Sequence, residues 1–379
     1  MPDRNLAKSL NEFAFDLYRQ LAGPNASNVF FSPYSLSVAL AMTLAGARGR
    51  TAHEIARVLR VSPEHTDIHA ALSALTTTLL GGPRNDYAIT TANGLWRQQG
   101  YPLRHEFLEV GQTSYGAACE ALDFAGQPAA ARQRINQWVE EHTGGLIKDL
   151  VPPGSLRGPL VLTNAVYFKG DWAAPFDERA TDRARFRIAF LKRVPVQMMH
   201  VLAHAAYADV GRAQVLELPY GDGALSMVVL LPKRVGGLAA LEAELSASRL
   251  AAWVGALHRE TVEVFLPRFR LVEHAELAQV LRALGMVTAF SDADADFSGM
   301  TDAQPGLRLS QVLHKAVVEV NEQGTEAGAG TAVTMSPTAS PHPPPIPVFR
   351  ADHPFVFLIR HRESGCILFM GRVVTPTES

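Results

Sequence analysis

Three side chains that lie far apart in this sequence have the types used for nucleophilic hydrolysis. They are Ser35, His314 and Asn164, which superficially resemble a nucleophile, a general base and an orienting amide. No orienting carboxylate accompanies them, and no oxyanion loop can be recognised. No Gly-x-Ser-x-Gly elbow occurs either, because residues 111–116 have the serine at the wrong spacing. We therefore expect that the protein is not an enzyme.

A second grouping has a spacing that metal sites use. His65 and His69 lie one helical turn apart, with Asp67 nearby. Without a third ligand, two such histidines more often belong to a solvated helix face than to a zinc site. No glycine-rich phosphate loop is present. We expect neither a metal nor a cofactor.

The segment that follows Val320 is the most informative part of the chain. It is small and polar, and composition alone would make it a flexible linker. Its periodicity argues otherwise, because every second residue from Thr325 to Met335 is small or apolar and uncharged, whereas the intervening residues are small or polar. The first set, called the inward set below, is Thr325, Ala327, Ala329, Thr331, Val333 and Met335. This alternation predicts a strand with one buried face, slim enough to enter between two existing strands.

Elements that must position this segment can be read from the rest of the chain. The amino-terminal third is mostly helical, with apolar residues at helical spacing in residues 6–17. Ser32 followed by proline is typical of a helix start, and residues 51–54 have the form of a capping box. A further helix is predicted over residues 129–142.

Strands are predicted after Pro159. Residues 160–168 form an apolar run typical of a central strand covered on both faces, and hairpin turns are predicted at residues 220–223 and 363–365. Strands and helices do not alternate, so we expect an α+β fold with mixed or antiparallel sheets. Residues 336–347 hold six prolines and should be exposed, extended and outside any sheet interior.

Composition limits the classes of partner. The chain has 379 residues, which by length alone suggests two domains, and its formal net charge is -2. We expect no nucleic-acid partner and no membrane partner, because the net charge indicates no basic stripe and no apolar run is long enough to span a bilayer. The amino end lacks a signal-peptide pattern, and Cys119 and Cys366 form no disulfide framework. These features suit a cytoplasmic protein or a trimmed secreted one; the excess of arginine over lysine favours a prokaryotic source.

Four ordered motifs resemble the serpin family over nearly the whole chain. They resemble the second helix, the third central-sheet strand, the fifth strand with its hinge, and the carboxyl end of that family. The motifs are Asn28-Val29-Phe30-Phe31-Ser32-Pro33-Tyr34-Ser35, Leu162-Thr163-Asn164-Ala165-Val166-Tyr167-Phe168-Lys169-Gly170-Asp171-Trp172, His314-Lys315-Ala316-Val317 through Gly324-Thr325-Glu326-Ala327, and Asp352-His353-Pro354-Phe355-Val356-Phe357 with Phe369-Met370-Gly371-Arg372-Val373.

The resemblance implies a single serpin domain over residues 1–379, which also resolves the conflict over length. Its fold would be α+β, with a large mixed central sheet, further antiparallel sheets, helices mainly from the N-terminal part, and an exposed reactive-centre loop at about residues 322–350. Serpins inhibit serine proteases as suicide substrates: the loop is cleaved, an acyl-enzyme forms, and the loop inserts as a new strand of the central sheet. The implied partner is a target serine protease in a covalent acyl complex, and the implied state is a monomer.

The resemblance also places the hinge and the reactive bond. The hinge comprises Glu322, Gly324, Thr325, Glu326, Ala327, Gly328, Ala329, Gly330 and Thr331. Counting along the hinge puts the reactive bond at Thr338–Ala339, with Met335–Ser336 as the alternative. No lysine or arginine occurs between Ala316 and Phe349, so elastase-like or subtilisin-like targets are favoured over trypsin-like ones. Gly328 and Gly330 depart from the alanine-rich hinge of inhibitors and keep a non-inhibitory chaperone, carrier or storage role open as the alternative.

Two supporting clusters follow from the same resemblance. The shutter would comprise Ser32, Ser35, Asn164 and His314, and the breach would comprise Trp172, Arg268 and Glu322. The shutter residues can equally form a static hydrogen-bonded core, since buried polar groups need partners in any case. The breach pair can equally be a solvated ion pair worth about 0–1 kcal/mol.

Overall fold

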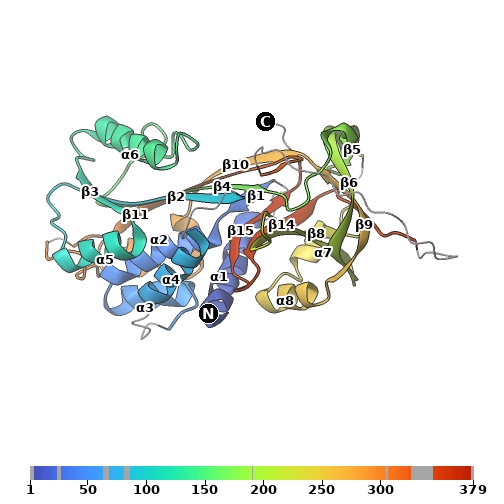
Figure 1. Cartoon of the computed structure of the whole chain (residues 1–379). Coiled ribbons are helices and arrows are strands. Elements are labelled where there is room, and N and C mark those ends of the chain that lie inside the picture. Colours follow the sequence, from blue (N-terminus) through green and yellow to red (C-terminus); the bar gives the residue numbers. More distant parts are fainter. Residues whose placement is uncertain are drawn as a thin grey trace.

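The computed structural model describes residues 4–23, 27–62, 68–80, 86–189, 191–303, 306–325 and 345–376. Within these residues the chain forms two sheets and a group of helices that lie mainly on one side of the central sheet (Figure 1). The α-helices are α1 (Arg4–Ala22), α2 (Pro33–Gly46), α3 (Gly49–Val58), α4 (Ile68–Leu80), α5 (His105–Tyr115), α6 (Pro128–His142), α7 (Leu238–Glu242), α8 (Ala247–Gly255) and α9 (Ala278–Ala283). Two short 3-10 helices are η1 (Glu178–Ala180) and η2 (Thr288–Phe290).

The central sheet is mixed. Its strand order is β10-β11-β4-β2-β3, with β12 paired to β4 outside this path. The strands are β2 (Tyr87–Gln98), β3 (Ala118–Leu122), β4 (Leu160–Asp171), β10 (Phe269–Glu276), β11 (Leu309–Val320) and β12 (Gly324–Thr325). β11 and β4 run parallel as neighbours, whereas β10 and β2 run antiparallel to them on either side.

The second sheet has the order β1-β15-β14-β8-β7-β6-β9-β13, with β5 paired to β6. Its pairs are antiparallel except for the parallel edge pair of β13 with β9. The strands are β1 (Val29–Phe31), β5 (Asp182–Arg187), β6 (Arg193–Val210), β7 (Ala213–Pro219), β8 (Leu225–Pro232), β9 (His258–Pro267), β13 (Val348–Arg350), β14 (Phe355–His361) and β15 (Ile367–Val373). The predicted α+β class with a mixed central sheet and further, largely antiparallel strands is confirmed.

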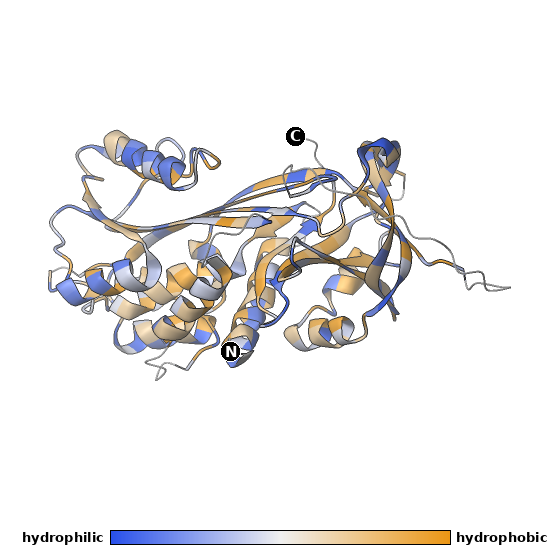
Figure 2. Ribbon diagram, viewed as in Figure 1, coloured by the Kyte–Doolittle hydropathy of each residue, from blue (hydrophilic) through white to orange (hydrophobic). Residues whose placement is uncertain are grey.

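β4 separates two apolar layers. Leu162, Val166 and Phe168 face the main core, which also contains α1, α2 and the second sheet. Val161 and Ala165 face the opposite side, where α6 covers the sheet. Figure 2 shows hydrophobic residues along the strands between these layers, interspersed with white and blue ones. This double cover explains why the strand reads as a continuous apolar run. None of the described helices is long and apolar enough to cross a membrane.

Most predicted elements are confirmed, including the helix after Ser32, the helix over residues 129–142 and both hairpins. The capping box at residues 51–54 is wrong. α3 begins at Gly49, and its N-cap Arg48 makes no side-chain cap. Glu54 instead accepts hydrogen bonds from the backbone N–H groups of Val287 and Thr288, and these distant donors replace the local N–H that a capping box would supply.

Candidate functional site

The two central strands separate at one end of the central sheet. β11 pairs with β4 from Leu309 to Val317, and the last partner on β4 is Tyr167. Beyond that point β12 takes the place beside β4, in antiparallel orientation, with Gly324 opposite Asp171 and Thr325 opposite Gly170. The first residues of the predicted loop are therefore already hydrogen-bonded into the central sheet.

Gly324 can occupy this position only as glycine. Its φ is +149°, and a Cβ built on it would lie 2.1 Å from the carbonyl oxygen of Gly170 and 2.6 Å from the Cα of Asp171. Both obstacles are backbone atoms of β4, so no side chain can move aside. The close approach of the turn to β4 depends on the missing side chain.

Two residues of the shutter connect β11 to β4. His314 and Asn164 are opposite each other in the ladder, and both side chains are buried. Nδ1 of His314 lies 2.7 Å from Oδ1 of Asn164, while the backbone N–H of Ser32 donates to Nε2 of His314 over 3.2 Å. Nε2 must therefore be unprotonated, so the ring is neutral with its proton on Nδ1. Burial lowers the pKa of His314 from 6.5 to about 3, which agrees with a neutral ring.

The other shutter residues extend the same network beneath the sheet. The Asn164 amide donates to Oγ of Ser35 over 2.6 Å and to Oδ1 of Asn93 over 2.5 Å. Oγ of Ser32 donates to the Leu368 carbonyl at 2.7 Å and accepts from the backbone of Ser35 at 3.1 Å. All four predicted shutter residues thus lie in one network that joins α2, β4 and β11.

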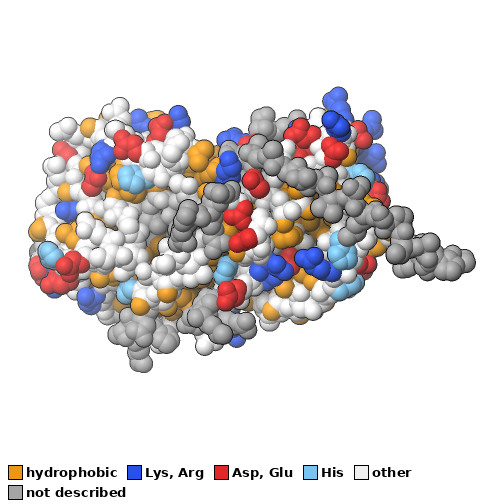
Figure 3. All heavy atoms as spheres, in the orientation of Figure 1, with side chains coloured by type: hydrophobic (Ala, Val, Ile, Leu, Met, Phe, Trp, Pro, Cys, Tyr) orange, Lys and Arg blue, Asp and Glu red, His pale blue; other side chains and the backbone are white. Residues whose placement is uncertain are grey.

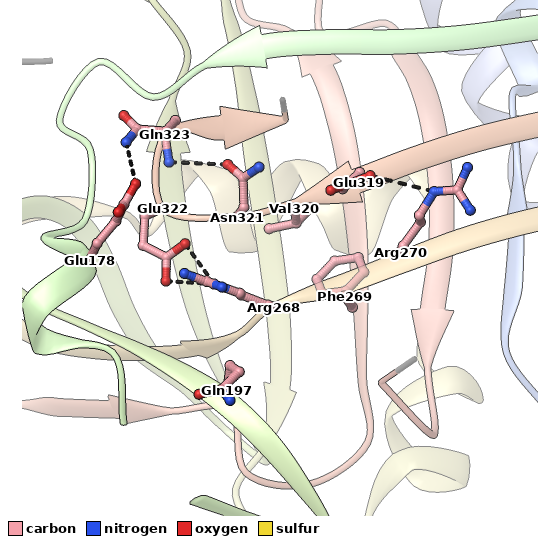
Figure 4. Close-up of a pocket in the computed structure, with 10 residues that line it drawn as sticks. All are labelled: Glu178, Gln197, Arg268, Phe269, Arg270, Glu319, Val320, Asn321, Glu322 and Gln323. Carbon is pink, nitrogen blue, oxygen red and sulfur yellow. Dashed lines mark hydrogen bonds and ion pairs between the residues drawn. The ribbon is translucent and has the colours of Figure 1, made fainter. Parts of the chain in front are cut away.

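The three breach residues also lie together, at the end of the sheet where β11 and β4 separate. Nε of Arg268 lies 2.7 Å from both carboxylate oxygens of Glu322, and the two side chains point toward each other (Figure 4). Glu322 is only 2 % exposed and also accepts a hydrogen bond from the Thr181 hydroxyl. The arginine is 40 % exposed, so water reaches one side of the pair.

Trp172 holds the turn that precedes β12. Its ring is stacked on Tyr220 with centroids 4.5 Å apart, and its Nε1 donates to the carbonyl of Asn321 over 3.0 Å. Its backbone N–H donates to the carbonyl of Gln323 over 2.8 Å. A cavity of about 500 Å³ beside this turn is lined by Arg268, Glu322 and neighbouring residues of β10 and β11.

Several predicted residues lie outside the described part of the chain. These are the hinge from Glu326 to Thr331, the reactive-bond residues Thr338 and Ala339, and the alternative bond Met335–Ser336. His65 and Asp67 also lie outside it. The described residues contain no cluster of three or more side chains suited to holding a metal ion.

The chain is described again from residue 345, where the proline-rich stretch ends. The carbonyl of Pro347 accepts from the backbone of Glu263 over 2.9 Å, and β13 then pairs with β9 at the edge of the second sheet. Pro347 therefore lies at a sheet edge, outside any sheet interior.

Two residues that contribute to these networks carry little or no signal in the sequence. Asn93 lies inside β2 and faces Asn164 across the ladder, and the polar residue in a buried strand was its only sequence signal. Thr181 lies in the link between η1 and β5, and no sequence pattern connects it to Glu322. The contact depends on how the second sheet meets the central one.

Comparison with known proteins gives matches along almost the full length. A family model described as Serpin (serine protease inhibitor) matches residues 8–376. An uncharacterized serpin-like protein of Thermococcus kodakarensis is 41% identical over 377 residues, covering 99% of this chain and 87% of the relative. Serpin B6 of Macaca fascicularis is 40% identical over 379 residues, covering 98% and 99%. The structure of human thyroxine-binding globulin has a TM-score of 0.89 at 31% identity and covers 99% of both chains.

Proposed function

The chain belongs to the serpin family, and we propose that it inhibits serine proteases as a suicide substrate and is not itself an enzyme. The observation that carries this proposal is the short antiparallel ladder of β12 with β4, which starts at the gap between β4 and β11. A cleaved loop can extend this ladder without any change of register or direction.

Extending the ladder accounts for the alternation in the loop. Continuing from Thr325 opposite Gly170 would put Ala327 opposite Phe168 and Ala329 opposite Val166. Residues opposite each other in a ladder share a face of the sheet, and these β4 residues face the main core. The inward set would therefore enter the main core, while the polar set would face the side covered by α6. Small inward residues suit this position, because the space between β4 and β11 opens only as far as these two strands move apart.

The length of β4 also supports insertion. β4 spans Leu160–Asp171, and the same register would bring Met335 opposite Leu160, at its first residue. A cut at Thr338–Ala339 would leave three more residues to span the base of the sheet, whereas a cut at Met335–Ser336 would leave none. We therefore place the reactive bond at Thr338–Ala339.

The chemical step follows from this bond. The protease serine would attack the carbonyl carbon of Thr338, the bond to the nitrogen of Ala339 would break, and the new amine would leave with a proton. An ester would join the loop to the protease. Insertion before hydrolysis would carry the protease along the sheet by about 3.3 Å per residue, which for about 14 residues is roughly 45 Å. The absence of lysine and arginine near the bond favours elastase-like or subtilisin-like targets.

The experiment is to mix the intact chain with subtilisin and with an elastase, and to look for a complex that survives boiling in detergent. Sequencing the released peptide identifies the cut bond, and subtilisin with a blocked active-site serine serves as the control. A carrier role remains the second candidate, because thyroxine-binding globulin, which binds thyroxine, shares this fold and the loop contains Gly328 and Gly330. Cleavage without any stable complex, and with no rise in the melting temperature of the cleaved chain, would favour that second role.

A further inference from the structure

A cluster of basic side chains covers one face of the hairpin formed by β5 and β6. In the ladder, Arg183 is opposite Gln197, Arg185 is opposite Pro195, and Arg187 is opposite Arg193. Opposite residues share a face, so the four arginines project from the same side of the hairpin. Lys192 in the turn is exposed as well. Figure 3 shows lysine and arginine side chains gathered over this hairpin, beside a smaller group of acidic ones.

The other face of the hairpin is anchored to the protein. Phe186, Val196 and Met198 alternate with the basic positions, and all three are buried. The hairpin is therefore an amphipathic ribbon with an apolar inner face, and its arginines are held outward by the packing beneath them. This fixes the positions of the charges relative to the rest of the molecule.

Most of these charges have no acidic partner within the part of the chain that the structure describes. Arg183, Arg185, Lys192 and Arg193 make no ion pair with a described carboxylate, and only Arg187 approaches one, at 3.8 Å from Asp352. Repulsion among unpaired like charges raises the free energy of the unbound protein, and the binding of a surface of opposite charge lowers it.

An apolar residue accompanies the charges. Leu191 is 90% exposed and lines, with Arg185, Arg193 and Pro195, a surface hollow of about 760 Å³. Arginine is enriched in protein–protein interfaces, and an exposed leucine offers apolar area that a bound protein surface can bury. A polyanion such as nucleic acid would need the charges but would leave Leu191 without a partner. The combination of arginines with an exposed leucine therefore favours an acidic protein surface as the partner.

The hairpin lies beside both ends of the reactive-centre loop. On one side, η1 and the residue before β5 hold the loop's start, through Glu178 to Gln323 at 2.9 Å and through Thr181 to Glu322. On the other side, the backbone N–H of Arg187 donates to the Asp352 carbonyl at 2.8 Å, just past β13. A protease bound to the loop is thereby brought to the end of the molecule that carries the basic cluster.

We propose that Arg183, Arg185, Arg193 and Leu191 form an exosite that selects target proteases with an acidic surface next to the active site. The proposal rests on the inhibitory function proposed above and adds a criterion for the target that the reactive bond does not supply. Steering by opposite charge raises association rates, and the increase is lost at high ionic strength.

The test uses one protease in two forms, unmodified subtilisin and subtilisin whose surface lysines are succinylated. Active-site titration and turnover of a small peptide substrate verify that both forms are equally active. We expect the intact chain to react roughly tenfold faster with the succinylated form at low salt, and equally fast with both forms at high salt. The double variant Arg185→Glu with Arg193→Glu should lose this preference.

A matched control carries the same charge change elsewhere. Lys8 on α1 and Arg157, which precedes the end of β4 farthest from β12, are exposed and make no ion pair with a described carboxylate. Lys8→Glu with Arg157→Glu should keep the preference. An equal loss in both double variants would show a net-charge effect and overturn the exosite. Retention on a heparin column tests the polyanion alternative. If the two subtilisins react at equal rates and only Arg185→Glu with Arg193→Glu loses retention on heparin, the cluster binds polyanions, and the exosite proposal is overturned. If no stable complex forms with either subtilisin, the proposed inhibitory function is wrong. If complexes form but at the same rate with both subtilisins at low salt, only the exosite is wrong.

Discussion

The imidazole of His314 joins the two strands between which the loop would insert, because its Nδ1 lies 2.7 Å from Oδ1 of Asn164 on the neighbouring strand. The same ring accepts from the backbone of Ser32 at the start of α2. One neutral side chain therefore links β11, β4 and a helix beneath them. Inserting a strand between β11 and β4 requires the hydrogen bond between His314 and Asn164 to break.

This linkage predicts how the stability of the uncleaved protein depends on pH. Burial lowers the pKa of His314 from 6.5 to about 3, so the unfolded chain binds a proton in this range that the folded chain does not. Stability should be unaffected well above pH 6.5 and should fall as the pH decreases from 6.5 toward 3, by at most about 1.4 kcal/mol per pH unit. Urea unfolding at about pH 7.5 and about pH 5.5 measures this loss. His314→Gln should show about 1 kcal/mol less of it, and an identical pH dependence in both proteins would contradict the assignment.

The second prediction concerns the turn that starts the ladder. Gly324→Ala places a Cβ against the backbone of β4, so β12 must leave its present position. We expect the variant to be cleaved as a substrate more often, with roughly tenfold fewer trapped proteases per cleavage if displacement costs about 1.4 kcal/mol. The stoichiometry of inhibition measures this ratio. Gly255→Ala, at a glycine whose Cβ would meet nothing within 4 Å, is the control and should behave as the wild type.

The third prediction separates the two faces of the proposed inserted strand. Thr325→Arg would place a guanidinium in the main core, whereas Glu326→Arg would place the same group on the opposite face. An unpaired buried charge costs several kcal/mol, so only the first variant should lose trapping while remaining cleavable. Detergent-stable complex with subtilisin is the measurement. Equal trapping by both variants would show that the inward set has been assigned to the wrong face.

The fourth prediction concerns the breach. Arg268→Ala leaves the buried Glu322 carboxylate with the Thr181 hydroxyl as a remaining partner. We expect a loss of about 1–3 kcal/mol in urea unfolding, below the value for fully buried pairs because the arginine is partly exposed. Arg270→Ala, which removes a half-exposed contact with Glu319 on the same strand pair, should cost about 0–1 kcal/mol. Similar losses in the two variants would indicate that the breach pair acts as an ordinary surface pair.

The predicted elements depended on local signals, and most of them are confirmed. The buried strand β4, the proline after Ser32 and the glycine-containing hairpin turns all carry their information within a few residues. The capping box failed because Glu54 binds the backbone of Thr288, more than two hundred positions away, and no local pattern records that partner. The net charge also failed to reveal a tertiary feature. The value of -2 is a sum over the whole chain and does not indicate that arginines cluster on β5 and β6.

The candidate site was predictable as far as motifs extend. The four shutter residues and three breach residues came from the family resemblance, and the structure brings each set together. Asn93 and Thr181 were missed because each contributes a single polar group through tertiary packing. The pairing of Thr325 with Gly170 could not be deduced from the alternation, because periodicity gives the faces of a strand but not its register.

The pairing of Gly324 and Thr325 with β4 has a consequence for the rate of the proposed insertion. Starting a new strand ordinarily requires two chain segments to find each other, and the loss of conformational freedom at that stage dominates the barrier. In this chain Gly324 and Thr325 already pair with β4, so the strand that we propose to form after cleavage would have its first residues in place beforehand. Cleavage would free the loop to extend this ladder, so the rate of insertion should be limited by how fast β11 detaches from β4.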